Sequence, residues 1–245
     1  MIRSSLFNLS FYLFTFVVVL LLVPLIFLPG RKLLMKGANL WGKGCLWLLN
    51  WVGGISIRFD GQQHLPENGP YLIAAKHQSE VDGIAILAII PNVVTIAMQE
   101  LGRYPIFGRL MRKMRMILVD SEGGIKSQNS LTIRADKAVS SERPILIYPE
   151  GRLVPVGEKS KYKTGIFHLY DDFSLPVIPV ATNVGLRWPQ RNFRKHPGTA
   201  TIEFLPPILP GLEKQEFMEL LFSRVEDRSN ELADLESAKK ELSYV

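Results

Sequence analysis

Residues 11–28 form an uninterrupted apolar run, FYLFTFVVVLLLVPLIFL, without a charged side chain. As a helix this run would be about 27 Å long, just enough to cross a bilayer core of about 30 Å. A cleaved signal peptide is the rival interpretation. However, the run is long for the apolar part of such a peptide, and no small-residue cleavage site precedes residues 29–32. We therefore expect a retained membrane anchor.

The charges around this run indicate an orientation. Four basic residues follow it and one precedes it: Arg31, Lys32, Lys36 and Lys43 after the run, and Arg3 before it. Basic residues favour the cytoplasmic side, so we expect the rest of the chain to face the cytoplasm. A second apolar stretch, residues 40–52, is short for a span and favours an interfacial segment. Whether the first run crosses the bilayer or forms a re-entrant pair with the second stays open.

Beyond residue 55, short β-like runs alternate with helical patterns. The predicted strands cover residues 56–59, 71–75, 93–98, 116–119, 145–148, 177–181 and 200–204. The predicted helices cover residues 82–89, 106–113, 127–139 and 164–170. This alternation is typical of an α/β domain built on one sheet. We expect membrane-anchoring and interfacial segments in residues 1–54, the α/β domain in 55–211, and an amphipathic helix packed back on it in 212–245.

The net charge of +6 favours anionic partners such as nucleic acid, an anionic membrane surface or phosphorylated molecules. The sequence lacks the usual signatures of nucleic-acid binding, so no nucleic-acid partner is expected. The one cysteine, Cys45, lies in an apolar run, where a thiol usually acts as a small hydrophobic group. Since there is no cysteine and histidine cluster for zinc, we expect no metal site.

His77 differs from the other three histidines because it lies between a predicted strand and a predicted helix, in the segment KHQSEVD. Open α/β sheets bind ligands at such junctions. Ser79 and Asp82 also fit an S-x-x-D capping box, which would explain the segment without any chemistry. The functional alternative is that Asp82 bonds one ring nitrogen of His77 and raises the basicity of the other. Residues five apart on one helix point to different faces, so His77 would have to precede the helix.

A second polar segment, Tyr148-Pro149-Glu150-Gly151-Arg152, follows another predicted strand. Proline ends the strand, and glycine permits a tight turn. Glu150 and Arg152 would then project from the carboxyl end of the strand. Alone, the segment is equally well explained by an ordinary turn with a surface ion pair.

Taken in order, these and other motifs make the chain resemble the bacterial 1-acyl-sn-glycerol-3-phosphate acyltransferases of the glycerolipid acyltransferase superfamily. His77 and Asp82 match the family's H-x4-D motif, and Ser79 matches its usual serine. The stretch QELGRYPIFG, the apolar strand ending in Asp120, the Y-P-E-G segment 148–151 and the segment VIPV at 177–180 match the later motifs. Their order and spacing agree over about residues 60–210.

Several positions depart from the family pattern. Ser121 replaces the usual arginine after Asp120, and Met98-Gln99 replaces a lysine common before Glu-Leu. Arg152 occupies a usual threonine position and Leu153 a usual arginine position. These are positions that would bind a phosphate group. Other basic residues near the motifs could substitute for them: Lys161, Lys163, Arg103 and Arg115.

The resemblance implies an α/β fold with a single mixed sheet flanked by helices, as in glycerol-3-phosphate acyltransferases, after an N-terminal membrane-inserted helical segment. It implies transfer of an acyl group from acyl-carrier protein or acyl-CoA to the sn-2 hydroxyl of 1-acyl-glycerol-3-phosphate, giving phosphatidic acid. His77 would be the general base and Asp82 its partner. Backbone N–H groups after Ser79 would stabilise the oxyanion. The implied substrate-binding residues are Ser79, Glu150, Gly151, Arg152 and Lys163.

The resemblance also implies partners and a location. The acyl donor is a co-substrate, and no metal or other cofactor is needed. The implied location is the inner, cytoplasmic membrane of a bacterium, with the catalytic domain facing the cytoplasm. Two basic groups, in residues 103–115 and 187–195, would bind anionic membrane lipids, with Trp188 and Phe193 beside the second. Two rival functions remain: an acyltransferase for another lysolipid, such as a lyso-ornithine lipid, and a non-catalytic membrane scaffold.

Overall fold

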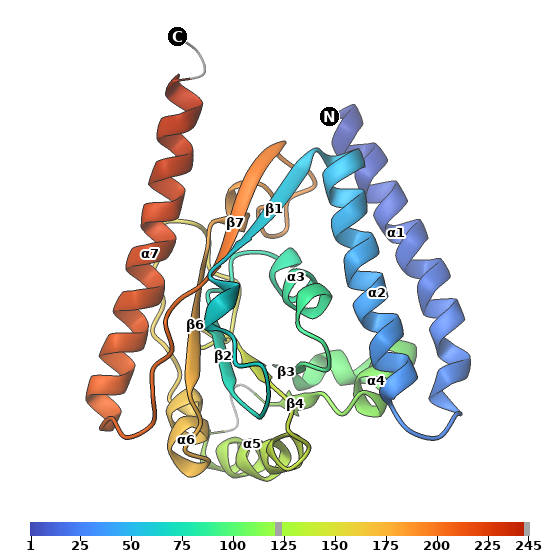
Figure 1. Cartoon of the computed structure of the whole chain (residues 1–245). Helices are drawn as coiled ribbons and strands as arrows, with labels where there is room; N and C mark the ends of the chain where they lie inside the picture. The colour runs from blue at the N-terminus through green and yellow to red at the C-terminus, as the bar shows by residue number, and fades with distance from the viewer. Residues whose placement is uncertain (121–123, 243–245) are drawn as a thin grey trace.

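The computed structural model of the chain contains one seven-stranded sheet in the residues that it describes, 1–120 and 124–242 (Figure 1). Its strands are β1 (Ile55–Asp60), β2 (Leu72–Ala75), β3 (Val94–Met98), β4 (Ile117–Val119), β5 (Ile145–Ile147), β6 (Val177–Thr182) and β7 (Gly198–Phe204). All seven strands predicted from the sequence are confirmed, with ends displaced by one or two residues.

The strands lie in the order β1-β7-β6-β2-β5-β3-β4. The five strands from β6 to β4 are parallel. β7 runs antiparallel to β6, and β1 is parallel to β7. The sheet is therefore mixed, as expected. Because β2 and β5 are parallel neighbours, the segments that follow them emerge side by side at one edge of the sheet.

Helices cover both faces of this sheet (Figure 1). The helices of the α/β domain are α3 (Val81–Ile89), α4 (Pro105–Lys113), α5 (Gly124–Val139) and α6 (Gly165–Asp172), and the C-terminal helix is α7 (Lys214–Leu242). Shorter helical turns are η1 (Val23–Ile26), η2 (Leu49–Gly53), η3 (Gln62–His64), η4 (Gln99–Arg103) and η5 (Val184–Leu186). Each predicted helix of the domain is present, and the tail helix packs back on the domain as expected.

Strand alternation divides the core into two layers. In β2, Ile73 and Ala75 face α3, whereas Leu72 and Ala74 face α5, α6 and α7. Consecutive side chains of a strand point to opposite faces of the sheet. The sequence of a strand that is covered on both faces is therefore a continuous apolar run. Burying each large aliphatic side chain stabilises the fold by about 1.5–3 kcal/mol.

The N-terminal segment is a hairpin of two antiparallel helices, α1 (Ile2–Leu22) and α2 (Lys32–Leu48), on the side of the sheet opposite α7 (Figure 1). α2 packs closely on α3, because Gly42 lacks the side chain that would meet Ala88. The amide of Asn39 also donates to the carbonyls of Leu87 and Ala88, at 2.8 and 3.0 Å. The residues predicted as an interfacial segment thus form the second arm of the hairpin and the turn after it.

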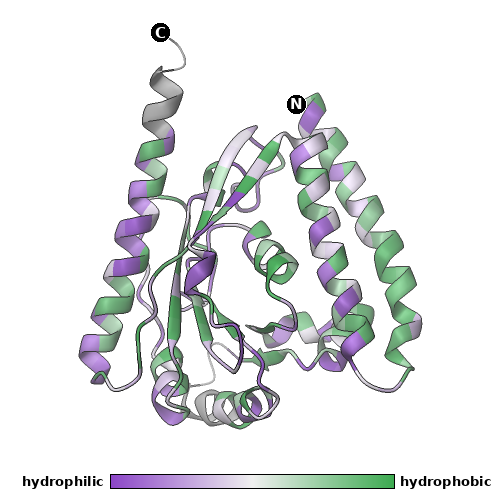
Figure 2. Ribbon diagram, in the orientation of Figure 1, coloured by the Kyte–Doolittle hydropathy of each residue, from purple (hydrophilic) through white to green (hydrophobic). Residues whose placement is uncertain are grey.

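The outward face of this hairpin is strongly apolar (Figure 2). Its exposed large apolar side chains include Leu9, Leu13, Phe16, Leu20, Phe27, Leu40, Trp47 and Trp51. In the described part of the chain, residues Ile2–Ile26 are the one helical segment whose length and composition would allow it to cross a membrane. α1 is therefore a candidate membrane segment.

The hairpin is nevertheless attached to the domain at both ends. Near its start, the Ser4 hydroxyl accepts from the Lys195 N–H at 3.1 Å, and the Asn8 amide donates to the Phe193 carbonyl at 3.0 Å. Near its turn, the Lys113 ammonium donates to the Leu28 carbonyl. Both ends of α1 therefore lie against the same globular body.

One sequence-based prediction about membrane docking is wrong. Trp188 is not an interfacial side chain but is only 8% exposed, and its ring packs edge-on against Phe7 and Phe11 of α1. Arg187 beside it is paired with Glu236 of α7. Phe193 is 54% exposed and remains available at this surface.

Candidate active site

The end of β2 sends two neighbouring side chains to opposite faces of the sheet. Continuing the alternation of the strand, Lys76 points toward α7 and His77 points toward α3. His77 lies in the segment before α3, which begins at Val81. The condition that the sequence imposed, that His77 must precede the helix on which Asp82 lies, is met.

His77 and Asp82 form a pair. The His77 Nδ1 atom lies 3.2 Å from the Asp82 Oδ2 atom, and the side chains are 23% and 2% exposed. A hydrogen bond from Nδ1–H to the carboxylate fixes the tautomer in which Nε2, on the opposite side of the ring, is free to accept a proton. The ring also stacks on Tyr148, with centroids 3.9 Å apart.

Asp82 combines the two roles that the sequence left as alternatives. Its Oδ2 atom also accepts from the backbone N–H groups of Gln78 at 2.7 Å and Ser79 at 2.9 Å. The carboxylate therefore both organises the start of α3 and holds the imidazole. Burial raises the pKa of Asp82, while the bonds from His77 and these two amides oppose the rise.

The same contacts correct one prediction and bear on a second. Ser79 is fully buried, and its Oγ atom accepts from the Val81 N–H at 3.3 Å rather than reaching a substrate. The Asp82 N–H donates to the Ser79 carbonyl at 3.2 Å. The amides of residues 81 and 82 are thus already engaged, and an oxyanion role for the backbone N–H groups after Ser79 stays a prediction.

Glu150 holds the main chain of His77. Its Oε2 atom accepts from the His77 N–H at 2.8 Å, and its Oε1 atom forms an ion pair with the Lys76 ammonium at 2.6 Å. Burial raises the pKa of Glu150, and Lys76 opposes that rise. Because the Glu150 side chain is fully buried, direct substrate contact, as expected from the sequence, is wrong for this residue.

A cleft of about 790 Å³ opens beside His77 at the carboxyl ends of the parallel strands. Its walls are apolar over much of their area and come from β3, β4, β5 and the loops after them, including Ile96, Met98, Leu101, Val119, Tyr148 and Leu153. Three cationic residues also line it: Arg152, Lys163 and Arg191. The cleft thus joins an acid–base group, an apolar wall and positive charge.

The turn after β5 brings two of these cations together. Gly151 has a φ of +68°, a conformation that favours glycine, and a Cβ atom there would lie 2.8 Å from Lys163 Cε. The Lys163 N–H donates to the Pro149 carbonyl at 2.8 Å, which ties the two loops to each other. Gly151, Arg152 and Lys163 therefore lie in the cleft, and their substrate-binding role stays a prediction.

The other basic residues considered from the sequence lie elsewhere. Lys161, Arg103 and Arg115 are not among the described residues that line the cleft. Met98, one of the two residues that replace a lysine common in the resembling family, does line it and adds an apolar group to one wall. Ser121 lies outside the described residues.

Sequence reasoning missed Lys76 and Arg191 as parts of this site, and it gave Tyr148 no role beside His77. A lysine directly after the apolar strand YLIAA was the one available signal for Lys76, since a charge rarely continues a buried strand. Arg191 reaches the cleft from a loop far along the chain, where its N–H donates to Glu80 Oε1 at 3.2 Å. No local pattern marks that contact.

The fold and the site define a class: an α/β protein with a histidine–aspartate pair at a partly apolar, cationic cleft beside an apolar helical hairpin. Residues 56–183 match the profile of the family described as Acyltransferase. This match covers more than half of the chain, so the chain belongs to the Acyltransferase family and is an acyltransferase.

Curated relatives agree with this placement. The chain is 29% identical over 181 residues to the 1-acyl-sn-glycerol-3-phosphate acyltransferase of Pseudomonas aeruginosa, covering 74% of this chain and 70% of that protein. It is 26% identical over 189 residues to the enzyme of the same name from Limnanthes douglasii, covering 76% of this chain and 66% of that one.

The fold is also that of a solved acyltransferase. The crystal structure of the 1-acyl-sn-glycerophosphate acyltransferase PlsC from Thermotoga maritima superposes with a TM-score of 0.78 at 20% identity, covering 95% of this chain and 97% of that one. The likeness includes the N-terminal hairpin, since nearly the whole chain is covered. It confirms the mixed-sheet architecture.

Proposed function

We propose that this protein transfers an acyl group from a thioester donor to the sn-2 hydroxyl of 1-acyl-glycerol-3-phosphate, giving phosphatidic acid for phospholipid synthesis. The observation that carries the proposal is the His77–Asp82 pair at the edge of the cleft, with Nδ1 and Oδ2 3.2 Å apart. The names of the curated relatives support this choice of acceptor.

In the proposed mechanism, His77 Nε2 removes the proton from the acceptor hydroxyl as the oxygen attacks the thioester carbonyl. The Asp82 carboxylate stabilises the imidazolium that forms, because its charge lies next to Nδ1. The imidazolium then returns the proton to the departing thiolate. A thioester is already activated, so this reaction needs no metal, further cofactor or covalent enzyme intermediate.

Arg152 and Lys163 are proposed to bind the phosphate of the acceptor, and Arg191 stands at the same cleft. Gly151 allows the turn that places them. The apolar wall would take an acyl chain. Acyl-CoA and acyl-carrier protein are both proposed donors, and assays with each carrier would distinguish them.

A second lysolipid acceptor, such as a lyso-ornithine lipid, is favoured by one specific observation. Leu153 lines the cleft at a usual arginine position, and Met98, from the pair Met98-Gln99 that replaces a common lysine, lines it too. An acceptor without a phosphate would tolerate these apolar replacements. An in-vitro panel of lysophosphatidate and lyso-ornithine lipid separates the two candidates by their kcat/KM values.

The hairpin is proposed to dock the enzyme on the cytoplasmic face of a bacterial inner membrane. Both ends of α1 contact the same domain, so a spanning α1 would require that domain to lie on both sides of the bilayer. Insertion of the hairpin into one leaflet avoids this conflict. The basic residues near Arg109 and Phe193 would then face anionic headgroups.

The test of the proposed function is acyl transfer by purified wild type and His77→Ala, together with rescue of a strain lacking its lysophosphatidate acyltransferase. The wild type should rescue growth, and His77→Ala should lose at least about 100-fold in kcat, since general-base catalysis contributes about 10²–10⁴-fold. If His77→Ala keeps activity within tenfold of wild type, the general-base assignment is wrong. A wild type that acylates no lysolipid would instead support the scaffold alternative.

A further inference from the structure

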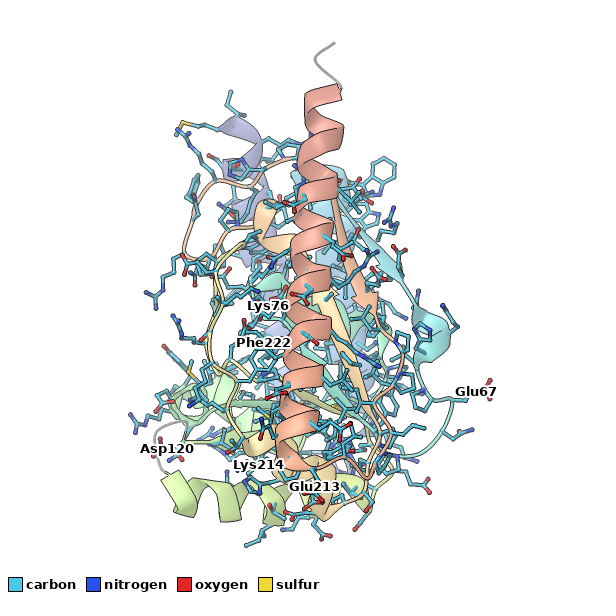
Figure 3. All side chains as sticks on the ribbon, turned by 90° about the vertical axis from the view of Figure 1, so that its left-hand side faces the viewer. Glu67, Lys76, Asp120, Glu213, Lys214 and Phe222 are labelled. Atoms are coloured by element: carbon cyan, nitrogen blue, oxygen red, sulfur yellow. The ribbon has the colours of Figure 1, made fainter. Side chains whose placement is uncertain are left out.

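Lys76 lies beside α7 (Figure 3), on the face of the sheet opposite His77. Its side chain is 2% exposed, and its ammonium has three hydrogen-bond acceptors and one further carboxylate oxygen as an ion-pair partner. Glu150 Oε1 lies at 2.6 Å, the two carboxylate oxygens of Glu226 each lie at 2.9 Å, and the Glu158 carbonyl lies at 3.1 Å. A buried ammonium with this many acceptors is held at one point.

Glu226 comes from the middle of α7, outside the residues that match the family profile. It is 1% exposed, and besides Lys76 it accepts from the Tyr162 hydroxyl at 3.0 Å. Two carboxylates therefore share one ammonium, and the tyrosine hydroxyl compensates part of the additional negative charge. Removing one member of such a buried network leaves the others without a partner.

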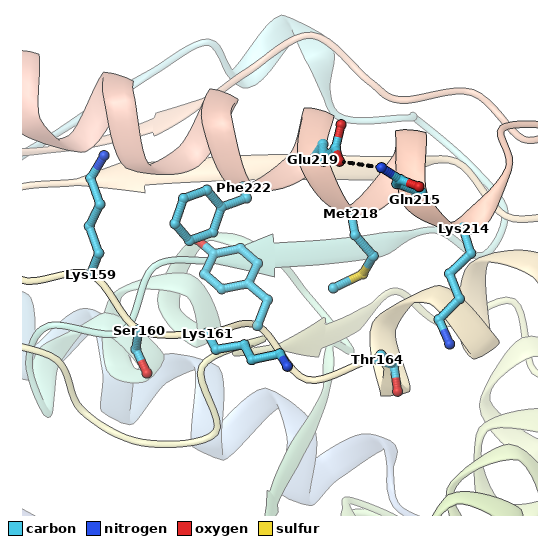
Figure 4. A pocket seen from close by; sticks show the side chains of 10 residues that line it. Lys159, Ser160, Lys161, Thr164, Lys214, Gln215, Met218, Glu219 and Phe222 are labelled. Atoms are coloured by element: carbon cyan, nitrogen blue, oxygen red, sulfur yellow. Dashed lines mark hydrogen bonds between the residues drawn. The ribbon is translucent and has the colours of Figure 1, made fainter.

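Tyr162 separates this network from solvent. It forms part of a groove of about 710 Å³ between residues 159–164 and the first half of α7, where Phe222 and several lysine side chains also lie (Figure 4). Tyr162 itself is 4% exposed, and its ring packs edge-on against Phe222. The charges of Lys76, Glu150 and Glu226 are therefore shielded from bulk solvent, and in such surroundings their positions are strongly coupled.

The network ends at the catalytic segment. Glu150 uses one oxygen for Lys76 and the other for the His77 N–H, at 2.8 Å. On its other side, the His77 carbonyl accepts from the Val154 N–H at 2.7 Å. The main chain of His77 is thus fixed from both sides, and its ring meets Asp82 as a result.

We propose that Lys76 and Glu226 are positioning residues for the acyl-transfer reaction. Glu226 fixes the Lys76 ammonium, Lys76 fixes the Glu150 carboxylate, and Glu150 holds the main chain from which the His77 ring projects. This inference rests on the proposed function of His77. It makes the C-terminal helix a structural part of the active site, because one of the residues that set the position of His77 belongs to α7.

The first experiment compares Glu226→Ala and Glu226→Gln with Glu231→Ala, which removes an exposed carboxylate paired with Arg228 on the same helix. Misplacement of a catalytic group by about 1 Å costs about 100-fold, so we expect Glu226→Ala to lower kcat by about 10- to 100-fold. KM for donor and acceptor should change by less than about threefold in Glu226→Ala, because neither Glu226 nor Lys76 lines the cleft. Glu226→Gln keeps an acceptor for Lys76 and should recover part of the loss, whereas Glu231→Ala should match wild type.

The second experiment detects the position of His77 without an activity assay. A downfield Nδ1–H proton resonance, assigned to His77 by its loss in His77→Ala, reports the bond to Asp82. We expect this resonance to weaken or shift in Glu226→Ala and to stay unchanged in Glu231→Ala. Because it needs no substrate, this readout tests the positioning role even if the wild type does not acylate lysophosphatidate, a result that would refute the proposed function instead.

Two outcomes would overturn the inference. One is a folded Glu226→Ala with kcat within twofold of wild type and an unchanged His77 resonance. The other is a loss of kcat that follows only the loss of folded protein, with a normal resonance in the fraction that remains folded. If Glu226→Ala does not fold, Glu226→Gln and Lys76→Arg decide the question, since both preserve hydrogen bonding but alter the geometry at Glu150.

Discussion

Replacement of Asp82 by asparagine removes a charge while preserving the shape of the site. All three hydrogen bonds to this carboxylate, from His77, Gln78 and Ser79, end on Oδ2. Oδ1 is buried and has no hydrogen-bond partner among the described residues. An asparagine with its carbonyl oxygen in the Oδ2 position therefore keeps all three bonds, and its amide group occupies the Oδ1 position. The variant should fold and keep the His77 ring in place.

The expected loss is specific to the transition state, in which the imidazole becomes charged. Two unit charges 3.2 Å apart interact by about 5 kcal/mol at an effective dielectric constant of about 20. A neutral hydrogen bond retains about 1 kcal/mol. A net loss of about 3–4 kcal/mol corresponds to a fall in kcat of about two to three powers of ten, at 1.36 kcal/mol per tenfold.

The assay is single-turnover transfer of a radiolabelled acyl group to lysophosphatidate at saturating substrate, beside a thermal melt of the same preparation. Tyr148→Phe serves as a comparison within the site, because it alters a partly buried neighbour that stacks on His77 but removes no charge. If folded Asp82→Asn retains kcat within threefold of wild type, then Asp82 does not stabilise an imidazolium, and the general-base mechanism built on this pair is refuted.

Three further predictions concern stability, the turn and the hairpin. Burial raises the pKa of Asp82 above its usual value of 3.8, so Asp82 holds its proton to a higher pH in the native protein than in the unfolded protein. The free energy of unfolding of the wild type, measured by urea titration, should therefore fall relative to that of Asp82→Asn as the pH rises from 3.8 through the raised pKa. Gly151→Ala should lower the free energy of unfolding in urea by about 1–2 kcal/mol, because the φ of residue 151 is +68°. The same substitution should displace Lys163 and so raise KM for the acceptor. An unchanged KM would argue against Lys163 as a phosphate ligand. Trp47→Ala and Trp51→Ala should each weaken partitioning into anionic vesicles by about 30-fold, because each loses about 2 kcal/mol of apolar burial in the lipid. Equal co-sedimentation of the variants and the wild type would exclude the hairpin as the docking element.

The strands and the proximity of His77 to Asp82 could be predicted because their signals are local, whereas the proposed catalytic role of the pair came from the order of the motifs along the chain. A strand buried on both faces is an apolar run bounded by polar residues, and β2, β5 and β6 have that pattern. His77 and Asp82 are five residues apart at a junction whose geometry follows from the order of strand and helix. For such features, a window of a few residues contains the determining interactions.

Other features depend on partners that are distant in the sequence. Lys76 meets Glu226 across 150 positions, so the local sequence identifies neither as a partner of the other. Trp188 has basic neighbours, a pattern typical of an interfacial residue, yet its partner Phe7 lies in α1. The position of Glu150 after a strand end predicts that it lines the cleft, but its carboxylate is buried in an ion pair with Lys76. Tertiary contacts decided each of these cases.

The pairing of β1 with β7 has a consequence for how the protein is made. Ile55 lies opposite Gly198, so the first strand of the sheet has no neighbour until the last strand has left the ribosome. At about 5–20 residues per second, that delay is roughly 7–30 s. The apolar hairpin emerges before both strands and spends this interval with no completed sheet to cover it. If the nascent chain reaches the membrane in that time, its hairpin would already be buried in lipid when β7 pairs with β1. Delivery to the bilayer and folding of the enzyme would then be a single process.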